Sequence, residues 1–188
     1  MKLHRCIIVA ALGVVLLAPL VRASDEDRKP GLSFGALEPV TAEAARTMAQ
    51  AWLKGLGKTD PAMQAQVEAI WRQEERPVLD RLADTFVLSD PTAAKLMADA
   101  RNPAVPAPTK VPEVFKDQKQ PVFYRANLAL AFARALSNRH VYDEALQSLV
   151  LFRPEQVVDP SVFLFHRAVC EHALLQKIEA ARTIIRLL

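Results

Sequence analysis

Apolar residues recur at helical spacing along most of the chain after residue 40. The first stripe places apolar side chains four residues apart: Ala44, Met48, Trp52 and Leu56. Three Asp-Pro pairs, at residues 60–61, 90–91 and 159–160, indicate helix starts, because Asp accepts hydrogen bonds from free N–H groups there and Pro fits the first helical position. Pro77 cannot donate to a helical ladder and interrupts the second stripe. The pattern predicts three or four antiparallel helices within residues 41–102.

Four more helices are predicted over residues 121–188. The first, over residues 121–138, is apolar around most of its circumference and must be covered on several sides. The second spans about residues 141–152 and the third begins at Asp159. The fourth carries apolar residues at spacings of three and four: Ile178, Ala181, Ile185 and Leu188. No strand pattern of comparable length competes, so the chain is predicted to be all-α and built from antiparallel helical hairpins.

A change of composition divides these helices into two groups. Residues 103–121 hold five prolines spaced by small or charged residues, which predicts an extended, semi-rigid linker. This linker would separate a helical region at residues 41–102 from a second region at residues 122–188. Residues 24–40 mix charges, prolines and glycines without periodicity and are predicted to be a flexible lead-in.

The first 23 residues have the pattern of a secretory signal peptide. A basic start containing Lys2 and Arg5 precedes an apolar run over residues 6–20 and a V-x-A site that ends at Ala23. The alternative is a retained membrane anchor, which the run disfavours because a bilayer-spanning helix needs about 20 apolar residues. We expect cleavage after Ala23 and export to the periplasm or the cell exterior.

Cleavage changes what charge and cysteine content imply. It would remove three of the 24 basic residues and leave 21 against 21 acidic ones. A neutral mature chain indicates neither nucleic acid nor an anionic membrane surface as a partner. Cys6 would leave with the signal, so Cys170 would have no cysteine with which to form an internal disulfide.

The last four helices show an internal repeat with an offset of 35 residues. Apolar residues correspond at three pairs of positions: Leu128 and Phe163, Leu130 and Phe165, Leu149 and Ile184. Small residues correspond at two more pairs, which are expected to be packing positions where helices cross closely: Ala133 and Ala168, Ala145 and Ala180. The last apolar face is expected to pack on residues 41–102 or on another subunit, unless the chain is a shortened form of a longer repeat protein.

Residues 122–188 resemble the tetratricopeptide repeat family. The matching tracts are Phe132-Ala133 with Leu136 on one helix, and Tyr142-Asp143-Glu144-Ala145-Leu146 with Leu149 on the next. The sequence departs from the family at three positions, where Ala129 replaces a Trp, Phe152 a small residue and Val157 a Pro. The resemblance implies a short α-solenoid of stacked hairpins, and an ordinary four-helix antiparallel bundle is the alternative.

The same resemblance implies a ligand groove on the concave side of the first helix of each repeat. Polar side chains follow that side of the helix over residues 121–138: Asn127, Arg134 and Asn138. His172 falls on the equivalent side of the second copy. Asn amides can pair with a peptide backbone and Arg with a carboxylate, so these four residues are the candidate partner-binding groups. The alternative is that they simply face solvent.

Candidate residues for catalysis or metal binding are few. His166 and Cys170 share a helical face but lack a third and fourth ligand, so no metal or other cofactor is predicted. The serines sit at helix ends or on faces expected to be exposed, without a nucleophile-elbow glycine. The favoured hypothesis is a non-catalytic, exported helical-repeat protein that binds a protein or peptide at the cell envelope. The alternatives are an envelope enzyme or accessory domain with a helix-lined pocket, and a structural bundle that self-associates as a homo-oligomer.

Overall fold

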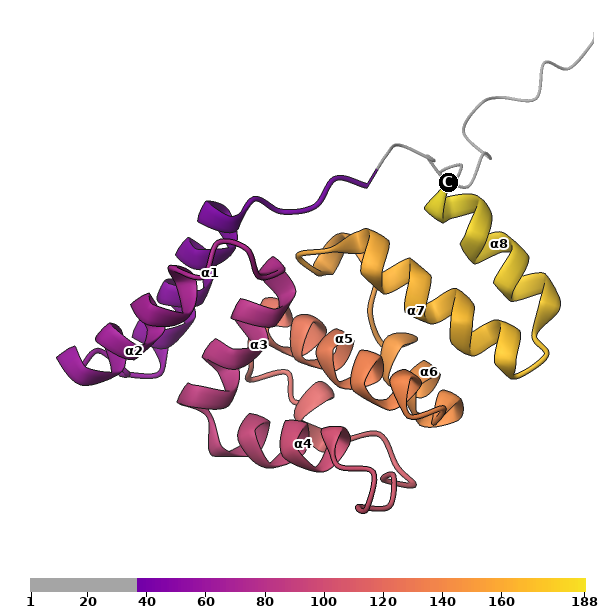
Figure 1. The fold of residues 1–188 in the computed structure, drawn as a ribbon, viewed down its shortest axis with the longest axis horizontal. Helices are drawn as coiled ribbons and strands as arrows, with labels where there is room; N and C mark the ends of the chain where they lie inside the picture. The colour runs from indigo at the N-terminus through magenta and orange to yellow at the C-terminus, as the bar shows by residue number, and fades with distance from the viewer. Residues whose placement is uncertain (1–36) are drawn as a thin grey trace, which may run out of the picture. The chain divides into compact units, whose positions relative to one another are not determined.

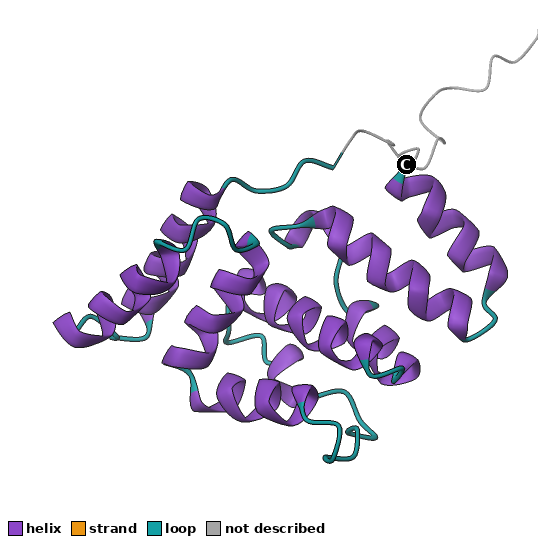
Figure 2. Ribbon diagram, in the orientation of Figure 1, coloured by secondary structure: helices purple, strands orange, loops and turns teal. Residues whose placement is uncertain are grey.

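The computed structural model describes residues 37–188, which contain eight α-helices and no strand (Figures 1 and 2). The all-α prediction is confirmed. The helices are α1 (Ala42–Gly55), α2 (Pro61–Trp71), α3 (Val78–Ser89), α4 (Pro91–Arg101), α5 (Val122–Asn138), α6 (Tyr142–Leu149), α7 (Pro160–Ala173) and α8 (Lys177–Leu187). Two 3-10 turns, η2 (Glu113–Phe115) and η3 (Pro154–Gln156), lie between them. The predicted signal peptide and its cleavage site lie outside the described residues.

Four of the eight described α-helices begin where the sequence supplies a side-chain acceptor. In these helices the side chain of the N-cap residue accepts a hydrogen bond from a backbone N–H of the first turn. The four N-cap residues are Thr41, Asp60, Asp90 and Asp159. Pro77 separates two helices, since α2 ends at Trp71 and α3 begins at Val78.

The helices are arranged as four successive pairs that share one packing rule. The side chains of Arg46 and Gln50 on α1 both bond to Glu68 on α2. Helix α3 then packs against both α1 and α2, α5 against both α3 and α4, and α7 against both α5 and α6. Helix α8 packs against α7. The first helix of each later pair is thus seated on both helices of the pair before it.

The α5–α6 and α7–α8 pairs repeat the same turn 35 residues apart. His140 and Leu175 have φ angles of 62° and 60°, the left-handed conformation that closes many helices. The N–H of Val141 bonds to the carbonyl of Leu136, and the N–H of Gln176 bonds to that of Glu171. The four alanines expected at packing positions are all buried (Ala133, Ala145, Ala168 and Ala180). The structure therefore has the same 35-residue offset as the sequence.

The Pro-rich segment differs from the linker expected at residues 103–121. Phe115 of η2 is 1% exposed and lies edge-on against Phe132 of α5, with ring centroids 5.4 Å apart. Arg139, just after α5, donates to three backbone carbonyls at the end of α4 and in the segment: Asp99, Ala100 and Val105. Residues 37–188 lie within one compact unit, so the Pro-rich segment does not separate two domains as expected. Proline content reports an extended backbone but not whether its side chains are buried.

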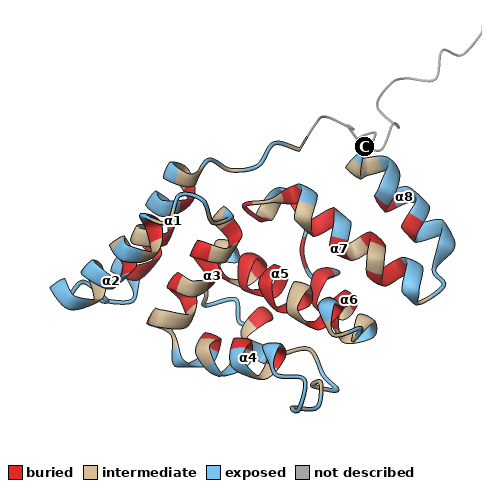
Figure 3. Ribbon diagram, in the orientation of Figure 1, coloured by how far each residue is buried: buried red, intermediate tan, exposed pale blue. Residues whose placement is uncertain are grey.

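One aromatic cluster joins the two groups of helices. Trp52 of α1 stacks on Tyr124 of α5 at 4.8 Å, and Phe86 of α3 meets both rings edge-on. Figure 3 shows α5 buried around most of its circumference, as its apolar sequence predicts, while much of α8 is exposed. The core is therefore continuous from α1 to α7.

Candidate binding surfaces

The structure places Asn127 inside the core and not in a ligand groove. Its side chain is 1% exposed, donates to the carbonyl of Phe123 at 2.7 Å and accepts from the N–H of Val158 at 2.8 Å. Val158 lies in the short segment that connects η3 to α7. The prediction that Asn127 contacts a partner is wrong, because both ends of its amide already hold the protein's own backbone.

Arg134 and Asn138 are brought together, but against the preceding helices. Nη2 of Arg134 lies 2.6 Å from Oδ1 of Asp80 on α3. The two residues line a small hollow of about 120 Å³ with side chains of α3 and α4, which has room for a few water molecules. His172 does not line this hollow and is exposed near the end of α7. The four predicted groove residues thus do not form one site.

The buried Ser137 and His166 are bound to each other. Nδ1 of His166 lies 2.8 Å from Oγ of Ser137, which donates to the carbonyl of Arg134 at 3.1 Å. Which atom donates in the Ser137–His166 bond depends on the tautomer of the imidazole. Burial, and secondarily the charge of Arg134, lower the pKa of His166 to about 4. The pair joins α5 to α7, and Ser137 lies at the end of α5, one of the helix-end positions predicted for the serines.

Cys170 is a buried thiol without ligand partners among the described residues. Burial, with a smaller effect from Glu171, raises the pKa of Cys170 to about 12, so the thiolate is not formed near neutral pH. No group of three His, Cys, Asp or Glu side chains within residues 37–188 is placed to hold a metal ion. The buried side chains of Ser137, His166 and Cys170 thus contribute to the packing of the helices.

Two adjoining hollows form a groove between α1 and the segment that leads into α5. One hollow, of about 620 Å³, is lined mainly by polar residues: Leu56, Lys58, Ser89, Asp90, Pro91, Thr92, Glu113, Val114, Lys116, Asp117 and Gln120. The other, of about 600 Å³, is mainly apolar: Met48, Ala51, Trp52, Gly55, Leu56, Lys119, Gln120, Pro121 and Phe123. Leu56 and Gln120 line both hollows. We call the whole the α1–α5 groove.

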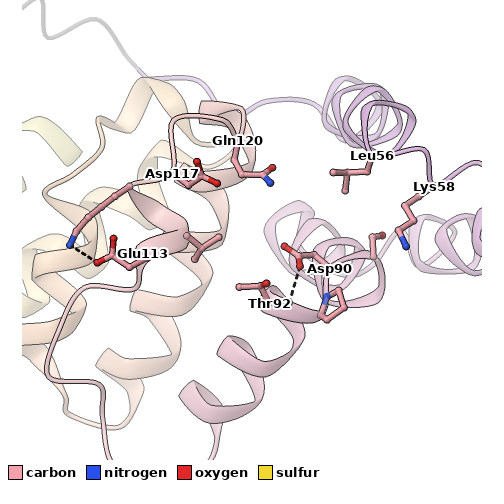
Figure 4. A pocket seen from close by; sticks show the side chains of 11 residues that line it. Leu56, Lys58, Asp90, Thr92, Glu113, Asp117 and Gln120 are labelled. Atoms are coloured by element: carbon pink, nitrogen blue, oxygen red, sulfur yellow. Dashed lines mark hydrogen bonds and ion pairs between the residues drawn. The ribbon is translucent and has the colours of Figure 1, made fainter.

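The polar half of the α1–α5 groove is shaped by Asp90. In Figure 4 the side chains of Glu113, Asp117 and Gln120 lie on one side, those of Leu56 and Lys58 on the other, with Asp90 between them. Oδ1 of Asp90 accepts from the N–H of Thr92 at 2.8 Å and its other oxygen accepts from the hydroxyl of Tyr124. These bonds fix the carboxylate at the start of α4.

Tyr124 ties this carboxylate to the aromatic core. Burial first, and then the hydrogen bond to Asp90, raise the pKa of Tyr124 well above its ordinary value. The phenol therefore remains a donor throughout the neutral range. Its ring stacks on Trp52, which lines the apolar half of the groove. The two halves of the groove thus rest on one rigid aromatic pair.

Sequence reasoning did not find the α1–α5 groove. Met48 and Leu56 belong to the apolar stripe at residues 44–56, yet they are 45% and 39% exposed. The apolar stripe on α1 is visible in the sequence. Only the tertiary structure shows that α1 lies beside residues 113–121, which form the other wall of the groove.

A second surface of interest lies on the last helix pair. Large apolar side chains are exposed there, at 53% for Phe165 and 41% for Ile184, with three more nearby: Leu175, Ile178 and Ile185. The last apolar face therefore does not pack on residues 41–102 as expected. These side chains belong to more than one side of the pair, and Phe165 and Ile184 come from its two different helices. An exposed apolar cluster indicates an interaction site more often than scattered apolar side chains do.

Comparison with known proteins adds no family assignment. No protein-family model matches this chain, and no curated protein or solved structure is significantly similar to it. Within the described residues, every helix is too short or too polar to span a bilayer. The two surfaces themselves must therefore indicate the function.

Proposed function

We propose that this chain is a non-catalytic, exported protein of the tetratricopeptide-repeat type that binds an extended segment of another protein in the α1–α5 groove at the cell envelope. The observation that carries the proposal is the joining of an apolar hollow to a charged one through Leu56 and Gln120. Export rests on the signal-peptide pattern of residues 1–23. The repeat type rests on the 35-residue recurrence of the hairpin turn.

The groove suits a ligand with an apolar residue beside a basic one. The apolar half offers Met48, Trp52 and Phe123 as contacts for an aliphatic or aromatic side chain. The polar half places Asp90 and Asp117 where a Lys or Arg of the ligand can pair with them. Gln120, at the junction, has both a donor and an acceptor for the ligand backbone.

The non-catalytic part of the proposal rests on the state of the buried reactive groups. Ser137 and His166 bond to each other but are both buried, at 6% and 9% exposed. A nucleophile must meet its substrate, and burial between α5 and α7 keeps this pair away from the surface. Cys170 is held as a neutral thiol by burial.

Selection from a phage library of random dodecapeptides tests the proposal. On the exported chain we expect enrichment of peptides in which an apolar residue is close to Lys or Arg. The variant Met48→Glu places a charge in the apolar half and should weaken binding of the selected peptides by about tenfold or more, which corresponds to about 1.4 kcal/mol.

The matched control is Leu151→Glu, because Leu151 lies outside the groove and is 43% exposed against 45% for Met48. It should leave the affinity unchanged. Equal binding to the wild type and to Met48→Glu, or no enrichment at all, would show that the groove does not bind peptides.

A further inference from the structure

Each of the first three helix pairs has a face on which the first helix of the next pair packs. Helix α3 is seated on α1–α2, α5 on α3–α4 and α7 on α5–α6. In each case the seated helix contacts both helices of the pair beneath it. The α7–α8 pair has a face in the same position, and the 35-residue repeat identifies its residues one by one.

The face of α5–α6 that α7 covers is marked by direct contacts. Asn127 bonds to the N–H of Val158, just before α7, and Ser137 bonds to His166 on α7. Leu130 lies between these two positions on the same side of α5 and is fully buried. On α6, Leu149 is also fully buried. These four residues define the covered face.

The equivalent residues of the second copy are exposed or only half-buried. Their positions follow from the offset of 35: Val162, Phe165, His172 and Ile184. Phe165 is 53% exposed where Leu130 is 0%, and Ile184 is 41% exposed where Leu149 is 0%. We call these four residues the α7–α8 face.

Some positions outside this face keep the same burial in the two copies. The packing alanines Ala145 and Ala180 are buried in both, at 0% and 3%. Val150 and Ile185 are exposed in both, at 54% and 62%. Ala126 and Leu146 are buried while their counterparts Ser161 and Ala181 are exposed, so the second copy is less covered at these positions too. Leu130 with Phe165 and Leu149 with Ile184 are the pairs in which a large apolar side chain is buried in the first copy and exposed in the second.

Helix α8 is basic overall and places one basic side chain beside this face. It carries Lys177, Arg182 and Arg186 against the single acid Glu179, and Arg186 pairs with Glu155. Lys177 is exposed and lies seven residues before Ile184, two helical turns away on the same side of α8. A partner with acidic side chains flanking its apolar stripe would be attracted to Lys177 and to the net positive charge of α8.

We propose that the α7–α8 face binds an acidic amphipathic α-helix of a partner protein, seated on α7–α8 as α7 is seated on α5–α6. This surface is separate from the α1–α5 groove and would hold a different segment. The partner helix would be of the length of α7, which has 14 residues, with apolar side chains at spacings of three and four.

The geometry favours a partner helix over a second copy of this chain. Two neighbouring helices present ridges and a groove into which the side chains of a third helix fit. A symmetric dimer through the same face would bring the basic α8 helices of both copies near each other, and like charges disfavour that contact.

The test uses a displayed library of amphipathic helices with acidic, neutral or basic solvent faces. We expect the exported chain to enrich the acidic helices. Ile184→Glu and Phe165→Glu, on different helices of the pair, should each weaken binding by about tenfold or more. Ile185→Glu adds the same charge beside Ile184 but lies outside the face, so it should change binding by less than about threefold.

Three results would overturn the inference. In the first, the chain enriches no helices from the library but still binds the selected dodecapeptides in the α1–α5 groove. That result would refute the inference about the α7–α8 face and leave the proposed function intact. Another is dimerisation in light scattering that Ile184→Glu abolishes, which would assign the face to a second copy. The third is sedimentation with vesicles containing anionic phosphatidylglycerol that Ile184→Glu abolishes, which would assign it to a lipid surface. Far-UV circular dichroism and the urea midpoint establish that each variant is folded.

Discussion

Several polar side chains in the interior of this protein bond to a group on a neighbouring element. The carboxylate of Glu171, 1% exposed on α7, accepts from Arg167 at 2.8 Å and from the hydroxyl of Thr183 on α8 at 2.6 Å. Asn127 and Ser137 do the same between α5 and the chain around α7. A buried polar group without a partner costs about 1–3 kcal/mol, so such bonds specify which helices meet.

His166 makes the stability of the fold depend on pH. Its pKa is lowered from 6.5 to about 4 in the folded protein, so the unfolded chain binds the proton more readily. This contribution to stability is complete above about pH 6.5 and is lost as the pH falls through 6.5 toward 4. Urea unfolding should show a loss of about 2 kcal/mol between pH 7 and pH 5 from this group.

The variant His166→Gln isolates this effect. Glutamine can still bond to Oγ of Ser137, as donor or acceptor, but does not titrate. Carboxylates contribute to the pH dependence of both proteins, so the difference between the two curves reports the imidazole. If the curves of unfolding free energy against pH are parallel for the wild type and His166→Gln between pH 7 and pH 5, then His166 has the same pKa in the folded and the unfolded protein.

At the scale of the element, one hairpin design occurs twice with different surroundings. The α5–α6 and α7–α8 pairs share the left-handed residue at equivalent positions and the same closing hydrogen bond. They differ in what covers them, since α7 lies on the first pair. Equivalent side chains therefore contribute unequally to stability.

Leu149 and Ile184 measure this inequality directly. Leu149→Ala removes a fully buried side chain and should cost about 2–5 kcal/mol of unfolding free energy. Ile184→Ala, at a position 41% exposed, should cost about 1 kcal/mol or less. Chemical denaturation of the two variants at low protein concentration gives the comparison. Similar losses would show that Ile184 is covered in solution, against the exposure on which the α7–α8 face depends.

At the scale of the whole molecule, the Pro-rich segment is part of the core. Phe115 is 1% exposed and packs on Phe132, and Arg125 of α5 donates to its carbonyl at 3.1 Å. These contacts tie residues 103–121 to α5. The same segment forms one wall of the α1–α5 groove, so the rigidity of the groove depends on this anchor.

Phe115→Ala should destabilise the entire fold by about 3–5 kcal/mol, because it leaves a cavity in the continuous core. Tryptophan fluorescence reports α1 and α2, which contain Trp52 and Trp71, while far-UV circular dichroism reports all helices. Both urea midpoints should fall together. Thr109→Ala, at an exposed position of the same segment, should have little effect. A cost below about 1 kcal/mol for Phe115→Ala would mean that the segment is a linker after all.

Local patterns were sufficient for the helices and for the repeat. Asp60, Asp90 and Asp159 mark helix starts because a cap bonds to N–H groups two or three residues away. The 35-residue offset was visible because equivalent positions keep similar side chains. Both signals depend only on residues close in sequence or on a comparison of the chain with itself.

Which side of each helix is covered was decided by the tertiary structure. Asn127 and Phe115 were misplaced because their burial depends on partners that no local pattern reveals. The groove and the interior depend on pairings such as Tyr124 with Asp90, 34 residues apart, and Arg134 with Asp80, 54 residues apart. Hydrophobic periodicity says that a face must be buried, but burial is a property of the surface that meets it, and that surface comes from elsewhere in the chain.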